Sequence, residues 1–416
     1  MDSPIPANAP VGAQPLGRSD LLTEAENLQD RTVDFRRRLH RRPELGLALP
    51  ETQAAILTEL DDLDLDVRTG TSVGSVVAVL SGAKAGPTFL LRGDMDALPM
   101  TEDTGLEFSS EISGAMHACG HDTHVAMLAG AARVLSSRRD DITGQVIFMF
   151  QPGEEGFHGA RYMLEEGLLG TVADAPVSGA FALHISSTFA SGTVHTRGGP
   201  LLASEDRIEI TVSGRGGHAS APHHANDPIP AACEIVQALQ TMVTRRVDVF
   251  DPAVVTIASF SAGTTHNVIP PTATLRGTMR TLSASTRTAV RDRVRRIAEG
   301  IAAGHGLGVT VELIAGYPVT LNDGTVATTV RDVAGKLLGP DRVPQMDFPI
   351  MGAEDWSYVL EEVPGAMAFL GACPAGLEPD KSPPNHSNLV VFDEAAFPTG
   401  VATYAAVALD ALSPSS

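Results

Sequence analysis

The feature that most constrains the fold is an alternation of short apolar runs with helical segments. The apolar runs span 74–80, 87–92, 145–150 and 179–184, and a helical segment at 122–138 separates the second run from the third. Apolar runs of this length are typical of strands that are buried on both faces of a sheet. Strands that alternate with helices indicate an α/β sheet that is largely parallel. We therefore expect an α/β domain built around such a sheet.

A different pattern occupies the region from residue 203 to residue 314. Residues 206–213 alternate between apolar and polar, which is the period of a strand with one solvated face. The expected elements after it are a helix at 227–247, strands at 253–261 and 272–281, a helix at 284–304 and a strand at 308–315. This β-α-β-β-α-β order is the split βαβ arrangement of a small, ferredoxin-like α+β domain. We predict that it is inserted in the larger domain.

The α/β pattern continues on both sides of the insertion. Helices are expected at 20–41 and from Pro50 onward, and later at 323–338, a strand at 366–371 and a last helix at 393–412. The larger domain is therefore predicted in two parts, residues 19–202 and residues 315–416, around the insertion at 203–314. Residues 1–18 are rich in proline and are expected to form a flexible N-terminal tail.

Charge and composition exclude several classes of protein. The chain has 30 Lys and Arg against 50 Asp and Glu, so its formal net charge of −20 argues against a nucleic-acid partner. Three cysteines in 416 residues exclude a disulfide framework and favour a reducing compartment. No run of apolar residues is long enough to cross a membrane, and residues 1–18 lack the pattern of a secretion signal. A cytoplasmic protein without a membrane partner is expected.

Polar clusters follow the ends of the predicted strands. The run at 87–92 leads into Asp94 and Asp96, the run at 145–150 leads into Glu154 and Glu155, and the fourth run ends at His184. In an open α/β sheet, ligands bind outside the carboxyl ends of the strands. Paired acids between glycines point in different directions, so one can bind a metal while the other acts as a general base. For Asp94 and Asp96, metal ligation and support of a histidine both remain open.

The segment 116–124 contains His117, Cys119, His121 and His124 between a glycine-bearing loop and a helix. Thiolate and imidazole are good ligands for zinc and similar ions, so this segment predicts a metal site. His117 and His124 are expected to support the site or to be structural. The other two cysteines, Cys233 and Cys373, are expected to be buried core thiols.

Short segments along residues 30–410 resemble, in their order, the amidohydrolase branch of the M20 metallopeptidases, which includes hippurate hydrolases, N-acyl-amino-acid deacetylases and auxin-conjugate hydrolases. The segments are LHRRPELG (39–46), GDMDALPM (93–100), MHACGHDTH (116–124), QPGEEG (151–156), ALH (182–184), GRGGHASAPH (214–223), HNVIP (266–270), GAEDWS (352–357) and NHS (385–387). The resemblance implies a di-metal, exopeptidase-like catalytic domain with an inserted dimerisation or lid domain.

The resemblance also implies roles for individual residues. The positions that match metal ligands are Cys119, His121, Glu155, His184 and His386. Glu154 matches the general base, and Asp96 matches an aspartate beside a metal-binding histidine. Many relatives have a histidine where Asp94 stands, so a ligand role for Asp94 is not carried over. No role follows for His40, and Asp355 either orients a ligand or caps a helix.

Three residues of the insertion also match positions of the family. His218 resembles a residue that reaches into the site of the partner subunit and stabilises the oxyanion. Asn267 and Arg280 resemble residues that contact the substrate's carboxylate or the developing oxyanion. A homodimer through the inserted domain is therefore expected, and a tetramer stays open.

The function implied is hydrolysis of the amide bond of small N-acyl amino acids, such as N-acetyl or N-benzoyl derivatives, by a water that two divalent ions activate. Zinc or manganese is expected, and cobalt and nickel remain alternatives. The same site would serve a dipeptidase or a carboxypeptidase. An inactive binding protein is disfavoured because Glu154 and all five candidate ligands are present.

Overall fold

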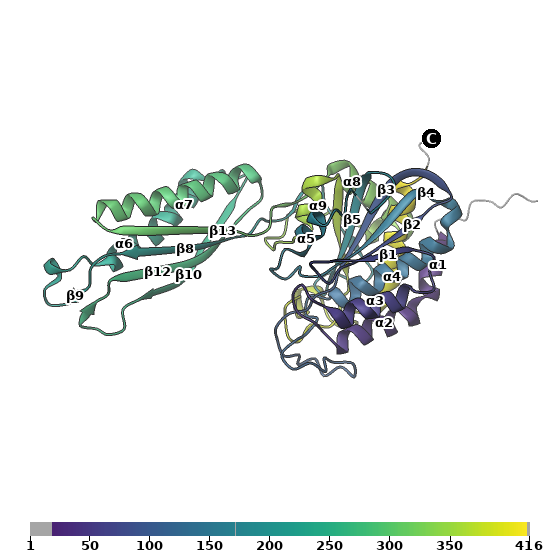
Figure 1. The fold of residues 1–416 in the computed structure, drawn as a ribbon, viewed down its shortest axis with the longest axis horizontal. Coiled ribbons are helices and arrows are strands. Elements are labelled where there is room, and N and C mark those ends of the chain that lie inside the picture. The colour runs from purple at the N-terminus through teal and green to yellow at the C-terminus, as the bar shows by residue number, and fades with distance from the viewer. Residues whose placement is uncertain (1–18, 171, 414–416) are drawn as a thin grey trace, which may run out of the picture.

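The structure is a computed structural model that describes residues 19–170 and 172–413. Figure 1 shows an elongated molecule with a large α/β body at one end and a smaller sheet covered by helices at the other. The predicted flexible tail, residues 1–18, lies outside the described residues. Among the described helices, none is long and apolar enough to cross a membrane.

The large body is built on a seven-stranded sheet in the order β1-β2-β4-β3-β5-β15-β6. Its strands are β1 (Asp66–Thr69), β2 (Val76–Ser81), β3 (Lys84–Asp94), β4 (Thr143–Gln151), β5 (Val177–Ser186), β6 (Val194–His195) and β15 (Gly365–Gly371). The four central strands, β4, β3, β5 and β15, are parallel. The outer strands β1, β2 and β6 pair antiparallel, so the sheet is mixed rather than largely parallel as expected.

Helices cover both faces of this sheet. One face carries α1 (Ser19–Asn27), α2 (Gln29–Arg41), α3 (Pro50–Leu60), α4 (His121–Ser137), α8 (Gly324–Leu338) and α10 (Phe397–Ala411). The other face carries the short helices α5 (Gly159–Glu165) and α9 (Ser357–Glu362). The helix expected at 20–41 is divided into α1 and α2 near Leu28. The last helix begins at Phe397, after a single 3-10 turn over Glu394–Ala396.

The smaller sheet has the order β10-β12-β8-β13, and all its pairings are antiparallel. Its elements are β8 (Asp206–Ser213), α6 (Pro228–Arg246), β10 (Ala253–Ala262), β12 (Thr272–Thr281), α7 (Ala284–Gly304) and β13 (Gly308–Ala315). This is the ferredoxin-like order that the sequence pattern predicts. Both helices pack on one face, where the apolar residues of the alternating strands form a separate core. The other face lacks helices in the described chain (Figure 1).

Two segments connect the sheets and run side by side. The short strand β7 (Gly199–Leu202) pairs antiparallel with β14 (Thr320–Asn322). Further toward the smaller sheet, the backbone N–H of Glu205 donates to the carbonyl of Tyr317, and that of Gly316 donates to the carbonyl of Glu205. The chain therefore leaves and re-enters the larger body through one hydrogen-bonded pair of segments. The domain limits 19–202, 203–314 and 315–416 remain a predicted division.

The structure separates the two cysteines that were expected in the core. Cys373 is buried, but Cys233 is exposed on α6, so that prediction was wrong for Cys233. The apolar residues of α6 that face the sheet include Ala231, Ala232 and Ile235. Cys233 lies between Ala232 and Ile235 in sequence, but the helical period turns its side chain to the outer face.

Candidate metal centre and active site

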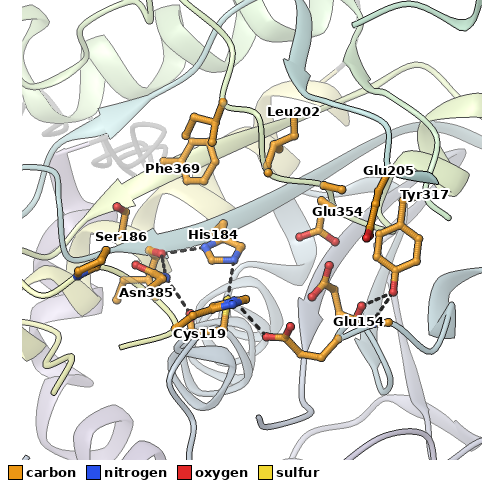
Figure 2. A pocket seen from close by; sticks show the side chains of 18 of the residues that line it. Cys119, Glu154, His184, Ser186, Leu202, Glu205, Tyr317, Glu354, Phe369 and Asn385 are labelled. Atoms are coloured by element: carbon orange, nitrogen blue, oxygen red, sulfur yellow. Dashed lines mark hydrogen bonds and ion pairs between the residues drawn. The ribbon is translucent and has the colours of Figure 1, made fainter. Parts of the chain in front are cut away.

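The candidate site lies at the carboxyl ends of the parallel strands. Strand β3 ends at Asp94, β4 ends at Gln151 just before the two glutamates, and His184 lies near the end of β5. Beyond these ends is a cavity of about 500 Å³. Figure 2 shows the side chains of Cys119, His184 and Glu154 around this common space. The strand-end location agrees with the rule for open α/β sheets.

The loop before α4 presents its ligands on both sides of Gly120. This glycine has φ +86°, and a Cβ there would lie 2.4 Å from the side chain of Ile185. Only glycine fits this left-handed position beside β5 without strain. The turn places Cys119 at the end of the loop and His121 on the first residue of α4. The amide of Asn385 donates to the carbonyls of Cys119 and Ile185 at 3.0 Å each, so a third segment fixes the loop.

All five predicted ligands converge. The Sγ atom of Cys119 lies 3.4 Å from Nε2 of His184 and 3.2 Å from Nε2 of His386. Oε1 of Glu155 lies 3.4 Å from Nε2 of His386 and 4.0 Å from Nε2 of His121. Ligand atoms of two sets lie within 4.8 Å of one another: Cys119 with His121 and His184, and Cys119 with Glu155 and His386. The shared cysteine suits a centre for two ions.

Orphaned polar atoms support a metal in this cluster. Both ring nitrogens of His121 and Oε1 of Glu155 are buried and form no hydrogen bond in the described chain, and their nearest charged neighbours lie 3.3–3.4 Å away. An unpaired buried polar atom typically costs about 1–3 kcal/mol, so such atoms are rare unless another group satisfies them. Divalent cations of the zinc type accept thiolate, imidazole and carboxylate ligands together. The residues therefore fit a divalent metal centre.

Asp96 holds two parts of the site together. Its carboxylate oxygens accept hydrogen bonds from the backbone N–H groups of Glu154 and Glu155, each at 3.0 Å. Its Oδ1 also lies 3.4 Å from Nδ1 of His121. The geometry gives Asp96 a positioning role for the paired glutamates and for the histidine ring.

The buried carboxylate of Asp94 contacts two histidines of α4. Its Oδ1 lies 2.5 Å from Nδ1 of His124, and its Oδ2 lies 3.3 Å from Nε2 of His121. The other ring nitrogen of His124 accepts a hydrogen bond from the backbone of Ile185 at 2.7 Å. Burial alone would raise the pKa of Asp94, but Arg92, His121 and His124 together outweigh it and hold that pKa well below its usual range. His124 thus connects Asp94 to β5 beside the candidate site, and a supporting role for it stays a prediction.

Glu154 is buried among other carboxyl groups. Its carboxylate forms one compact group with those of Glu354 and Asp355. Burial, the charge of Glu354 and then the charges of Glu155 and Asp355 raise the pKa of Glu154 well above its usual range. A carboxyl group with a raised pKa is suited to taking up and returning a proton near neutral pH.

Arg92 lies beneath these acids and was missed by the sequence reasoning. Its guanidinium is fully buried and lies 2.7 Å from Asp94, 2.8 Å from Glu354 and 3.2 Å from Asp355. Its Nε donates to the side-chain oxygen of Gln151 at 2.9 Å. A charged residue at the end of the apolar run FLLR was the available signal, because a buried arginine needs acidic partners.

Tyr317 was also missed. It lies on the segment that returns from the smaller sheet, and its hydroxyl donates to the backbone carbonyl of Glu154. The same hydroxyl accepts from the backbone N–H of Gly156 at 2.7 Å. Figure 2 shows Tyr317 beside the Glu154 loop. No local sequence pattern marks this residue, since its partners are far away along the chain.

A buried network lies behind the metal loop and gives His40 a structural role. Nδ1 of His40 lies 2.8 Å from Oδ2 of Asp122, and its Nε2 lies 3.3 Å from Oε1 of Glu102. The Arg36 guanidinium donates to the same Asp122 oxygen at 2.7 Å. These contacts connect α2 to the first turn of α4, the turn that carries His121.

The predicted residues of the smaller sheet separate into two groups. Arg280 lines the cavity, with its guanidinium 4.0 Å from the carboxylate of Glu205. His218 and Asn267 are exposed and neighbour each other at the paired strands β9 (Gly217–His218) and β11 (Val268–Ile269). Figure 1 places β9 at the end of the molecule far from the large body. One chain therefore does not bring these two residues to its own cavity.

Comparisons with known proteins agree with this architecture. Residues 90–410 match the model of peptidase family M20/M25/M40. The chain is 40% identical over 342 residues to the N-acetylcysteine deacetylase of Bacillus subtilis, covering 82% of this chain and 88% of that protein. It is 37% identical over 393 residues to thermostable carboxypeptidase 1 of Saccharolobus solfataricus, covering 94% of this chain and 97% of that protein.

A plant protein and a solved structure extend the match. The IAA-amino acid hydrolase ILR1-like 4 of Arabidopsis thaliana is 36% identical over 391 residues, covering 93% of this chain and 87% of that protein. The crystal structure of the Bacillus subtilis YXEP protein, a dinuclear metal binding peptidase from the M20 family, superposes with a TM-score of 0.80. It is 34% identical and covers 93% of this chain and 99% of that one. The chain therefore belongs to peptidase family M20/M25/M40.

Proposed function

We propose that this protein is a metal-dependent amidohydrolase that cleaves the amide bond of small N-acyl amino acids, including N-acetyl and N-benzoyl derivatives. The observation that carries the proposal is the buried carboxyl group of Glu154 beside five converging ligand residues at one open cavity. Relatives named as an N-acetylcysteine deacetylase and an IAA-amino acid hydrolase support this class of substrate. We also propose that it acts in the cytoplasm.

The ligand set would hold two divalent ions, zinc or manganese. Its members are Cys119, His121, Glu155, His184 and His386. When bound, such ions polarise the amide carbonyl and lower the pKa of a water molecule toward neutrality. A relative described as a dinuclear metal binding peptidase supports the number of ions. Softness favours zinc because the set includes a thiolate and several imidazoles.

Glu154 is the proposed general base and acid. Its backbone is held on both sides, by Asp96 at the N–H and by Tyr317 at the carbonyl. Its side chain accepts the proton of the attacking water and then returns it to the nitrogen of the leaving amine. The two hydrogen bonds restrict the loop, so the carboxyl group stays in place through both transfers.

Arg280 is the proposed anchor for the substrate's α-carboxylate. It reaches the cavity from the end of β12, and guanidinium–carboxylate pairs are strong and directional. His218 and Asn267 lie too far along the smaller domain to serve the same chain's cavity. We infer that they act on the cavity of a second copy in a homodimer formed through residues 203–314, where His218 would stabilise the oxyanion.

The first test is Glu154→Gln, which keeps the shape of the side chain but removes the proton acceptor. We expect hydrolysis to fall by about 10²–10⁴-fold, with the bound metal unchanged. Glu155→Gln is the matched control, since it should lower the metal content as well as the rate. Retention of most of the hydrolytic rate by Glu154→Gln would show that the general-base assignment is wrong.

The second candidate function is a carboxypeptidase or a dipeptidase. The 37% identity to thermostable carboxypeptidase 1 favours keeping it. A panel of N-acetyl, N-benzoyl and indole-acyl amino acids, measured beside dipeptides with each metal, separates the two functions. Faster turnover of the dipeptides would replace the amidohydrolase proposal with the peptidase.

The subunit assignment needs an experiment of its own. We expect mixed dimers of His218→Ala with the metal-site variant Glu155→Gln to recover hydrolysis, because one cavity in the mixed dimer has both its ligands and a functional His218. Each parent dimer should be nearly inactive. Absence of recovery in a mixture shown to have exchanged subunits would assign His218 to its own chain.

A further inference from the structure

A second cavity lies in the smaller domain, between α6 and α7. Its volume is about 630 Å³, within the range of sites for small molecules. Four of the side chains that line it are arginines: Arg245 and Arg246 from the last turn of α6, and Arg293 and Arg296 from the middle of α7. Among the described residues that line it, none is acidic. The metal centre shares no lining residue with it.

The four arginines have no partners in the described part of the chain. None of them forms an ion pair or a side-chain hydrogen bond there, whereas Arg287 and Arg291 of the same helix both pair with Asp206. Acidic residues outnumber Lys and Arg by 50 to 30 in this protein, so acidic partners for a surface cation are abundant. Four neighbouring arginines without a carboxylate are therefore a distinct feature of this surface.

Stabilisation of the helix explains only part of the cluster. Arg245 and Arg246 complement the negative end of the α6 dipole. Arg293 and Arg296 lie in the middle of α7, where the helix dipole has no such effect, and yet they face the same cavity. Their one-turn spacing places them on one side of the helix. The cluster thus draws on two helices that the fold brings together.

The chemistry of the cavity favours a compact anion. Guanidinium groups bind phosphate and carboxylate groups through two parallel hydrogen bonds, and several of them together select for multiple negative charge. The side chains of Met242 and Ile297 also line the cavity and can contact a short carbon skeleton. We propose that the groove between α6 and α7 binds a small anion with about three or four negative charges on phosphate or carboxylate groups.

Calorimetric titration of the metal-loaded protein tests this site. The probes are inorganic pyrophosphate and propane-1,2,3-tricarboxylate, and the tighter of the two identifies the preferred anionic group. We expect the double variant Arg293→Ala/Arg296→Ala to raise the Kd for that probe at least about tenfold. Arg245→Ala/Arg246→Ala, on the other helix, should weaken the same binding step. Both variants keep the metal centre intact, so binding lost with them belongs to the groove and not to the ions.

Arg295→Ala is the matched control. Arg295 lies between the two groove arginines on α7 and is exposed, but it does not line the cavity. Arg295→Ala removes one positive charge where each groove variant removes two, and it should change the Kd less than about twofold if the groove binds the anion. If Arg295→Ala weakens binding as much as the groove variants do, diffuse surface charge explains the lost affinity, and the proposal is overturned. Absence of a groove-dependent binding step for both probes would also overturn it. Melting temperatures of all variants check that each is folded.

Discussion

Removing the buried guanidinium of Arg92 should be one of the most damaging single changes to the folded state. In Arg92→Met, the carboxyl groups of Asp94, Glu354 and Asp355 lose a cation that lies within 3.2 Å of each. Removing one partner of a buried ion pair costs about 3–5 kcal/mol, and three acids share this cation. We expect the free energy of unfolding to fall by an amount near the upper end of this range, compared with a total of about 5–15 kcal/mol for a typical domain.

The matched control is Arg37→Met, which also removes an arginine from a pair with a carboxylate. Arg37 lies 2.6 Å from Glu394, but 39% of its side chain is exposed. Exposed pairs contribute about 0.2–1 kcal/mol, so this variant should lose at most that amount. Trp356, the only tryptophan of the chain, is buried next to Glu354 and Asp355, so its fluorescence in urea reports on this region directly.

The loss in Arg92→Met should also depend on pH. Burial is the largest cause that raises the pKa of Asp355 to about 8, and burial raises the pKa of Glu354 as well. Without the guanidinium, both values rise further. The wild type already binds a proton at Asp355 below about pH 8, so the extra proton of the folded variant appears above that pH, and the loss should grow as the pH rises above about 8. Equal losses in the two variants, or a loss in Arg92→Met that does not grow above about pH 8, would refute the reasoning.

Three further predictions rest on other parts of the structure. Burial lowers the pKa of His195 to about 4 from an ordinary value of 6.5. Between pH 4 and pH 6.5 the unfolded chain therefore binds a proton that the folded chain lacks. Stability should fall as the pH drops from 6.5 to 4, by about 1–2 kcal/mol after allowance for solvent screening, and His195→Gln should remove that slope in urea titrations. Tyr317→Phe should lower the free energy of unfolding by about 1–3 kcal/mol and should lower kcat more than it changes KM. Tyr358→Phe loses only a contact with His158 and should leave kcat nearly unchanged. A chelator should lower the melting temperature and zinc or manganese should restore it, since an ion held only by the folded chain adds about 2.7 kcal/mol at a hundredfold excess over its Kd; a melting temperature indifferent to both would contradict the metal centre.

Sequence reasoning succeeded where the physical signal is local. The smaller sheet was predicted almost residue by residue, because strands such as β8 alternate strictly between a buried and a solvated face. The meeting of Glu154, Glu155 and His184 followed from the rule that strand ends gather at one edge of a sheet, whereas the resemblance to the family implied that Cys119 and His121 join them. The strands β1 and β6 were not predicted, because they are short and have no apolar run of their own. The antiparallel pairings that they form at the edges of the sheet were therefore not predicted either.

The misses concern contacts between distant segments. The partners of Arg92 include Glu354 and Asp355, which lie more than 250 positions later in the sequence and meet it only in the folded chain. The hydroxyl of Tyr317 meets the Glu154 loop across the junction of the two sheets. Cys233 shows the reverse error, because an apolar neighbourhood in sequence does not determine which side of a helix is covered. The catalytic and ligand roles of the individual residues stay predictions until the variants are measured.

The paired segments between the two sheets have a mechanical consequence. Tyr317 and Glu205 belong to the same hydrogen-bonded crossing, and the hydroxyl of Tyr317 also grips the loop of the proposed base. A rotation of the smaller domain about this crossing would move the Glu154 loop as well, because the Tyr317 hydroxyl connects the two. The angle between the two bodies would then set the position of the Glu154 carboxyl group. Opening of the molecule to admit a substrate would displace Glu154, and closing would return it to its place in the site.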